Sequence, residues 1–256
     1  MEALQSVLNT FTNLIHGLGQ KPVKSSEKFL GIIAHRGVHG EGLAQENSTD
    51  AFRLAVENSI YGVEFDVRWT RDNVAVIYHD PHLGRLHQLP KVVIRNTYFE
   101  DLRKLAPDIP TLKEVAEQFG GKVHFMIELK ELMENQDQHA HLKEALSGLE
   151  VLKDFHFMSL DSDRLSSLEG YPNESLVDIA WFDMQSTYDE TLKRNHGGLT
   201  GHFMLLRDSH REQLNNKNIP YGTGFIETEG TLYKEIERGC TWVFTDMPLK
   251  LKAFLN

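Results

Sequence analysis

The chain has 256 residues, of which 40% are hydrophobic and 25% are charged, and its formal net charge is -10. This composition is typical of a folded globular protein and excludes a mainly disordered chain. The acidic balance argues against a general nucleic-acid surface, because such a surface needs clustered basic side chains. One cysteine, Cys240, excludes an internal disulfide. We therefore expect a cytoplasmic protein with no nucleic-acid partner.

The first twenty residues place hydrophobic side chains at helical spacing, at Leu4, Val7, Leu8, Phe11, Leu14 and Ile15. The segment lacks a basic start and a small-residue cleavage site, so we expect no signal peptide, and no run in the chain is long enough for a transmembrane segment. We predict an N-terminal amphipathic helix and lead-in over residues 1–28, followed by one domain over residues 29–256. The helix leaves open a homo-oligomer or contact with a membrane surface.

From residue 29 onward, short hydrophobic runs alternate with longer helical segments, which is typical of repeated β-α units and a parallel sheet. Strands are expected over residues 30–34, 62–68, 74–79, 122–129, 155–160, 176–181, 202–206, 219–225 and 241–245. A closed barrel needs eight strands, so one of these nine segments is surplus. We exclude 202–206 first and expect it to be an irregular segment. Helices are expected over residues 48–58, 98–105, 111–119 and 138–149, with the rest of 82–110 a loop.

Two carboxylates lie on one face of the strand expected at residues 62–68, because side chains alternate along a strand. The Cα atoms of Glu64 and Asp66 are then roughly 6 to 7 Å apart, so both side chains can reach one ion. At about 4 Å two such charges repel by roughly 4 kcal/mol at an effective dielectric near 20. A divalent cation removes this conflict, and Glu128, in another hydrophobic run, offers a third oxygen ligand. Oxygen ligands alone favour Mg²⁺ or Ca²⁺ over zinc.

His35 and His79 each close a hydrophobic run, where a parallel sheet presents its functional loops. Imidazole accepts and donates protons near neutral pH, so two histidines suit a reaction that needs a base and an acid. Arg36 and Lys130 are cations of the kind that bind a phosphoryl group. Each residue alone is more often structural or solvated, but together they predict a phosphate-ester site. We interpret most other histidines as structural, including His39, His82, His87 and His124.

These residues belong to a longer set of motifs. The set comprises His35-Arg36-Gly37, Gln45-Glu46-Asn47-Ser48, Glu64-Phe65-Asp66-Val67, Thr70-Arg71-Asp72, His79-Asp80, Arg85, Ile109-Pro110-Thr111-Leu112, Ile127-Glu128-Leu129-Lys130, Gly239 and Phe244-Thr245-Asp246-Met247-Pro248. In order and spacing the set resembles the glycerophosphodiester phosphodiesterase family, among the phosphatidylinositol phospholipase C-like TIM-barrel phosphodiesterases. The resemblance spans nearly the whole chain after the N-terminal helix.

The resemblance implies a (β/α)₈ TIM barrel that hydrolyses glycerophosphodiesters to sn-glycerol 3-phosphate and an alcohol, with one divalent metal ion, Mg²⁺ or Ca²⁺, as cofactor. The implied site residues are the metal ligands Glu64, Asp66 and Glu128, the acid/base pair His35 and His79, the phosphate-binding Arg36 and Lys130, and the supporting Glu46 and Asn47. We favour His35 as the base and His79 as the acid, while the reverse order stays open. The nucleophile is either water or the substrate's own 2-hydroxyl.

Three departures from the family pattern stand out. Gln45 replaces the usual proline, the insertion over residues 86–108 is short, and Gly222-Thr223-Gly224-Phe225 stands where the family often has Trp-Thr-Val-Asn. The last two touch regions that wall the pocket for the glycerol or the alcohol. Two alternatives therefore stay open: a phospholipase D-like enzyme acting on lysophospholipids or sphingolipids, and a non-catalytic phosphodiester-binding protein.

Overall fold

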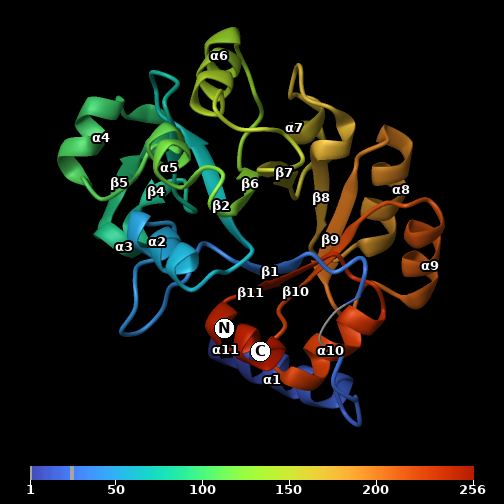
Figure 1. The fold of residues 1–256 in the computed structure, drawn as a ribbon. Coiled ribbons are helices and arrows are strands. Elements are labelled where there is room, and N and C mark those ends of the chain that lie inside the picture. The colour runs from blue at the N-terminus through green and yellow to red at the C-terminus, as the bar shows by residue number, and fades with distance from the viewer. Residues whose placement is uncertain (1, 24–25) are drawn as a thin grey trace.

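The computed structural model describes residues 2–23 and 26–256, with side chains from Asn9 onward. Among these residues, eight parallel strands close into a barrel that is surrounded by helices (Figure 1). Neighbouring strands follow the order β1, β2, β6, β7, β8, β9, β10 and β11, and β11 pairs with β1 to close the ring. The chain is therefore a (β/α)₈ TIM barrel, as predicted.

The barrel strands are β1 (Gly31–Ala34), β2 (Gly62–Trp69), β6 (His124–Leu129), β7 (Phe155–Ser159), β8 (Leu176–Ala180), β9 (Gly198–His202), β10 (Tyr221–Gly224) and β11 (Trp242–Thr245). The helices between and after them are α2 (Thr49–Glu57), α5 (Leu112–Phe119), α6 (Gln136–Ala145), α7 (Ser162–Ser166), α8 (Met184–Arg194), α9 (Asp208–Asn216), α10 (Glu229–Glu237) and α11 (Pro248–Leu255), with the 3₁₀ turn η2 (Asn173–Ser175) before β8. The remaining elements are α1 (Glu2–His16), β3 (Ala75–Ile77), β4 (His82–Leu83), α3 (Gly84–His87), β5 (Leu89–Val93), η1 (Ile94–Asn96) and α4 (Phe99–Leu105).

The choice of surplus strand is wrong. The strand outside the barrel is β3, which folds back and pairs antiparallel with the end of β2. The eighth barrel strand is β9, which ends where the demoted run begins. Periodicity does not reveal this strand, because two of its five residues are glycines. Close packing requires one of them, since a Cβ on Gly201 would lie 2.9 Å from the backbone carbonyl oxygen of Ala180. The segment expected to be mostly loop, residues 82–110, also contains the hairpin of β4 and β5.

Alternation along β2 separates the core from the site. Val63, Phe65 and Val67 point outwards and are buried beneath the surrounding helices, where the Phe65 ring packs against Phe52 of α2 at 5.5 Å. The residues between them point into the barrel. Its interior is filled by a separate cluster of buried side chains, Ile33, Met126, Met158, Val177, Trp242 and Phe244. This packing makes the barrel solid, so the polar residues gather at the carboxyl ends of the strands.

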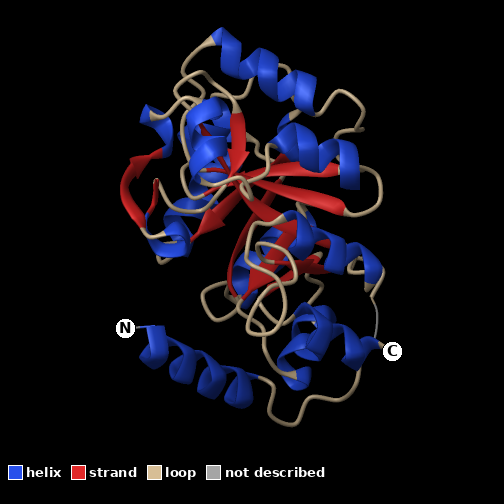
Figure 2. Cartoon of the chain, turned by 90° about the vertical axis from the view of Figure 1, so that its left-hand side faces the viewer, coloured by secondary structure: helices blue, strands red, loops and turns tan. Residues whose placement is uncertain are grey.

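The predicted N-terminal helix is present as α1, along the outside of the barrel (Figure 2). Its polar face packs inwards, since Asn13 is buried and His16 Nε2 lies 2.9 Å from Glu235 Oε1 of α10. Phe11 and Leu14 instead point outwards, each 59% exposed. The side chains of Leu4, Val7 and Leu8 lie outside the described part. The division at residue 28 and the homo-oligomer stay predictions, and no described helix is long and apolar enough to cross a membrane.

A capping box begins α5 and gives a test of the fold. The Thr111 hydroxyl accepts a hydrogen bond from the Glu114 backbone N–H, and the Glu114 carboxylate accepts one from the Thr111 N–H. We expect Thr111→Ala to lower the free energy of unfolding by about 1 kcal/mol, because a backbone donor loses its partner. Urea unfolding followed by circular dichroism measures this, with Thr111→Ser as the matched control. An alanine variant as stable as wild type would contradict the assignment.

Candidate active site

Three buried carboxylates meet at the barrel mouth. Glu64 and Asp66 share the inward face of β2, as predicted, and Asp66 pairs in register with Glu128 of the neighbouring strand β6. One oxygen from each of the three side chains lies within 4.8 Å of the others. We call these residues the carboxylate trio. The register of two adjacent parallel strands is therefore enough to assemble it.

Two cations compensate the trio. Lys130 Nζ lies 2.6 Å from Glu128 Oε1 and 2.8 Å from Asp66 Oδ1, and Arg36 Nε lies 3.4 Å from Asp66 Oδ2. Burial raises the pKa of Asp66, but the charges of Lys130 and Arg36 outweigh it and hold that pKa well below its usual range. Burial and the nearby charge of Asp66 raise the pKa of Glu64 to about 8. With all three carboxylates ionised, the trio would carry more negative charge than its two cations balance, and the raised pKa of Glu64 reflects this excess.

The trio fits a hard divalent cation. Its donors are all carboxylate oxygens, which Mg²⁺ and Ca²⁺ prefer. Glu64 Oε1 is buried and has no hydrogen-bond partner among the described residues. A buried polar atom without a partner is costly, so a bound cation would satisfy an oxygen that the protein leaves unpaired.

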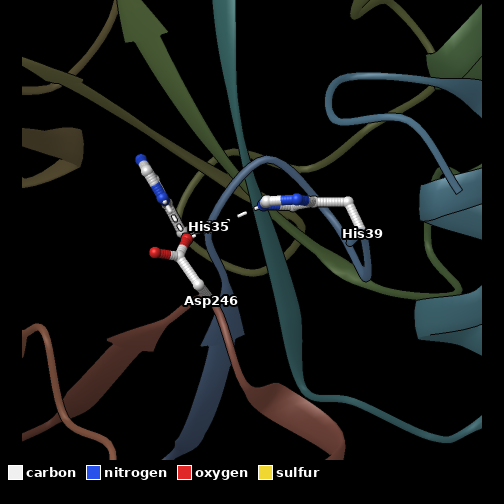
Figure 3. Close-up of side chains that lie close together, drawn as sticks. All are labelled: His35, His39 and Asp246. Carbon is white, nitrogen blue, oxygen red and sulfur yellow. Dashed lines mark hydrogen bonds and ion pairs between the residues drawn. The ribbon is translucent and has the colours of Figure 1, made fainter. Parts of the chain in front are cut away.

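His35 follows β1 and lies between two carboxylates. Its Nδ1 is 2.7 Å from Asp246 Oδ1, and its Nε2 is 3.8 Å from Glu64 Oε2. Asp246 follows β11, whose last residue pairs with the last residue of β1. Burial lowers the pKa of His35, but the hydrogen bond to Asp246 and the charge of Glu64 raise it to about 9. His39 Nε2 lies 3.7 Å from the same Asp246 oxygen, so two imidazoles flank one carboxylate (Figure 3).

His79 reaches the site from β3. The Tyr78 N–H donates to the Asp66 carbonyl, which brings the end of β3 beside the trio. His79 Nδ1 lies 2.7 Å from Asp80 Oδ1, and Arg85 Nε lies 2.9 Å from the other Asp80 oxygen. Burial, with the charges of Arg36 and Lys130, lowers the pKa of His79 despite the proximity of Asp66. The two histidines therefore have pKa values displaced in opposite directions.

The loop after β1 folds onto the trio. Arg36 and Asn47 both have positive φ angles, 53° and 55°, which non-glycine residues seldom adopt. Hydrogen bonds hold this conformation: Arg36 N–H donates to Glu64, Asn47 N–H donates to the Arg36 carbonyl, and Asn47 Nδ2 donates to Asp66 at 2.7 Å. Glu46 accepts hydrogen bonds from both Arg36 and Arg85. Glu46 and Asn47 thus fix the positions of a cation and a carboxylate.

The structure brings all nine predicted site residues into one connected region. It adds contacts that the sequence interpretation did not assign, from Asp246, His39, Asp80 and Arg85. Asp246 directly follows a predicted strand, so the strand-end rule that identified His35 could have found it. His39 carries no such signal, because it lies in the loop.

The sequence model of the Glycerophosphoryl diester phosphodiesterase family matches residues 35–250, and the chain belongs to this family. Human glycerophosphodiester phosphodiesterase 1 is 34% identical over 115 residues, which cover 40% of this chain and 34% of the human protein. The glycerophosphodiester phosphodiesterase of Bacillus altitudinis is 31% identical over 110 residues, which cover 39% of this chain and 44% of that protein. The matched segment thus spans less than half the length of each relative.

Solved structures share the fold. The glycerophosphodiester phosphodiesterase of Thermotoga maritima superposes with a TM-score of 0.73 at 25% identity, over 90% of this chain and 100% of that one. An Oleispira antarctica phosphodiesterase, solved in complex with the product sn-glycerol-3-phosphate, gives a TM-score of 0.74 at 24% identity over 88% of this chain and 96% of that one.

The raised pKa of Glu64 in the trio predicts that the stability of the folded chain depends on pH and on bound Mg²⁺ or Ca²⁺. The pKa of Glu64 is about 8 in the folded chain against an ordinary 4.5, so the folded state holds the extra proton in this window. The contribution of Glu64 to the free energy of unfolding therefore falls as pH rises from 4.5 to 8, and His35 adds the same sign between 6.5 and about 9. Buried histidines whose pKa is lowered, such as His156, act in the opposite direction below pH 6.5, so the fall is expected above that pH. Mg²⁺ or Ca²⁺ should raise the melting temperature most at the alkaline end, where the ligands are ionised.

Differential scanning fluorimetry with and without chelator measures this dependence. Glu64→Gln removes the titrating group, so its melting temperature should depend less on pH and on added cation. If Mg²⁺ and Ca²⁺ leave the melting temperature of the wild type unchanged at every pH, this result would contradict a cation site in the trio.

Proposed function

We propose that this chain hydrolyses glycerophosphodiesters to sn-glycerol 3-phosphate and an alcohol, and that it requires one divalent metal ion, Mg²⁺ or Ca²⁺. The observation that carries the proposal is the convergence of the trio, two cations and two histidines at one end of the barrel. Membership of the family and the product complex of the Oleispira phosphodiesterase support the same substrate class. The cytoplasmic location stays a prediction from the sequence.

The chain's own cations supply charge stabilisation. Glu64, Asp66 and Glu128 would hold the metal ion, which polarises a phosphate oxygen when bound. Lys130 and Arg36 lie against the trio, and a transferring phosphoryl group beside them gains two positive partners as negative charge builds. Burial lowers the pKa of Lys130, but Asp66 and Glu128 outweigh it and raise that pKa, so the ammonium stays protonated.

The charged partners of His35 and His79 favour different roles for them, one as acid and one as base. Among the described residues, Asp246 pairs only with the histidines His35 and His39, so its charge favours the imidazolium of His35. Asp80 shares its charge with Arg85, so it holds a proton on His79 less strongly. We assign His79 as the base that takes the proton of the nucleophile and His35 as the acid that protonates the leaving alkoxide. This order is the reverse of the one favoured from the sequence.

A coupled assay for glycerol 3-phosphate release from glycerophosphocholine and glycerophosphoethanolamine tests the proposed reaction. We expect release with Mg²⁺ or Ca²⁺ and none with chelator, because the trio cannot position the phosphate alone. His79→Ala should lower kcat by about a hundredfold or more, as loss of a general acid or base does. His141→Ala, which changes an exposed histidine of α6, is the matched control. Full activity in chelator, or in His79→Ala, would overturn the mechanism.

The assignment of His79 as the base predicts a shift in the pH profile. The base must be neutral, so kcat/KM falls on the acidic side as His79 takes up a proton. Arg85→Met leaves the charge of Asp80 unshared, which favours the imidazolium of His79, and the acidic limb should move to higher pH. Arg53→Met, an exposed residue of α2, is the control. An acidic limb that stays in place or moves to lower pH would contradict the assignment.

A further inference from the structure

Asn13 of α1 is fully buried, although its helix lies on the outside of the barrel beside α10 (Figure 1). Its side chain bonds to the main chain of the loop that follows β10. Nδ2 donates to the Phe225 carbonyl at 2.9 Å, and Oδ1 accepts a hydrogen bond from the Glu227 N–H at 2.9 Å. A buried amide is costly unless its donor and its acceptor are both paired. Asn13 meets this condition by holding the two residues on either side of Ile226.

The loop after β10 has a backbone conformation that needs this support. The φ angle of Phe225 is +65°, which a bulky residue rarely adopts, and such strain persists only where surrounding bonds hold it. Two further bonds come from α1: Asn9 Nδ2 donates to the Phe225 carbonyl at 3.2 Å, and the Thr10 hydroxyl donates to the Glu227 carboxylate at 2.9 Å. The helix therefore fixes the loop in a conformation that the sequence of the loop disfavours.

Thr245, the last residue of β11, connects this loop to the active site. Its hydroxyl donates to the Ile226 carbonyl at 2.7 Å and accepts a hydrogen bond from the Met247 N–H at 3.0 Å. Its carbonyl accepts a hydrogen bond from the His35 N–H at 3.1 Å. The hydroxyl thus spans Asp246, whose carboxylate bonds to His35 Nδ1 at 2.7 Å. Thr245 and Ile226 are both buried, so a displacement of the loop passes directly to this histidine and its aspartate.

We propose that Asn13 is a positioning residue for the acid His35. Its side chain fixes the loop after β10, and this loop fixes the orientation in which His35 delivers a proton to the leaving alkoxide. The inference rests on the proposed function and on the assignment of His35 as the acid. Asn13 lies outside residues 35–250, which the family model matches, so the support comes from a segment beyond that model. The N-terminal helix thereby acts in the reaction without contributing a group to the site.

The leaving group distinguishes this role from a merely structural one. The alkoxide of choline is a strong base and needs a proton from the acid, whereas p-nitrophenolate is a weak base and leaves without one. Displacement of a catalytic group by about 1 Å costs on the order of a hundredfold in rate. A variant that misplaces His35 therefore loses rate mainly with the choline diester. A variant that only lowers the amount of folded protein loses rate equally with both diesters.

The test measures kcat with Mg²⁺ for glycerophosphocholine and for the p-nitrophenyl ester of sn-glycerol 3-phosphate. The first kcat divided by the second is the leaving-group ratio, and His35→Ala shows how far it falls when the acid is lost. Asn13→Leu keeps the approximate size of the side chain and removes its hydrogen bonds, so it should lower the ratio by about tenfold or more. Thr245→Val removes the next link and should also lower it, whereas Thr245→Ser retains the hydroxyl and should restore the wild-type ratio.

His16→Leu is the matched control, because it breaks the contact of α1 with Glu235 of α10 and leaves the bonds to the loop in place. It should keep the wild-type ratio, and an equal fall in this variant would overturn the role of Asn13. A wild-type ratio in both Asn13→Leu and Thr245→Val would overturn the inference and leave the proposed function standing. A ratio that His35→Ala leaves unchanged would overturn the acid assignment and the inference with it. Cleavage of neither diester by the wild type would overturn the proposed function itself.

Discussion

The burial of three carboxylates against two cations is the constraint on which the rest of the site depends. Glu64, Asp66 and Glu128 lie within reach of one another at the end of β2 and β6, and Lys130 and Arg36 are the cations that oppose them. Removing charges from water costs several kcal/mol each unless partners compensate. The incomplete compensation explains why the pKa of Glu64 rises while that of Asp66 falls. Two of the same carboxylates, Glu64 and Asp66, accept hydrogen bonds that hold the loop after β1 in its two positive φ angles.

Neighbouring charges also set the proton affinities of the two histidines, His35 and His79. Each imidazole is hydrogen-bonded through Nδ1 to an aspartate, which fixes the ring, and His35 Nε2 faces Glu64 Oε2 at 3.8 Å. The aspartates differ in their second partner: Asp246 has His39, whereas Asp80 has the permanently charged Arg85. One structural device therefore gives two different proton affinities. Differential charge sharing of this kind is a common way for one site to contain both an acid and a base.

The sequence predicted the trio well because its assembly needs only local rules. Alternation places Glu64 and Asp66 on one face, and the register of adjacent parallel strands brings Glu128 to them. His79 was also placed at the site, but through an incorrect premise, because β3 is no barrel strand. It arrives by folding back on β2, a tertiary pairing that periodicity does not reveal. The glycines of β9 and the inward polar face of α1 escaped prediction for a related reason, since their packing partners are distant in sequence.

The most direct test of this account is the number of protons released when a metal ion binds. Titration calorimetry with Mg²⁺ near neutral pH measures this number. The observed heat is compared in two buffers of different ionisation enthalpy, and the difference gives the number of protons that the buffer takes up. Because the pKa of Glu64 is about 8, the cation must displace a proton from the trio. The account predicts saturable binding with release of about one proton from wild type and almost none from Glu64→Gln. Binding without proton release, or equal release from the variant, would contradict it.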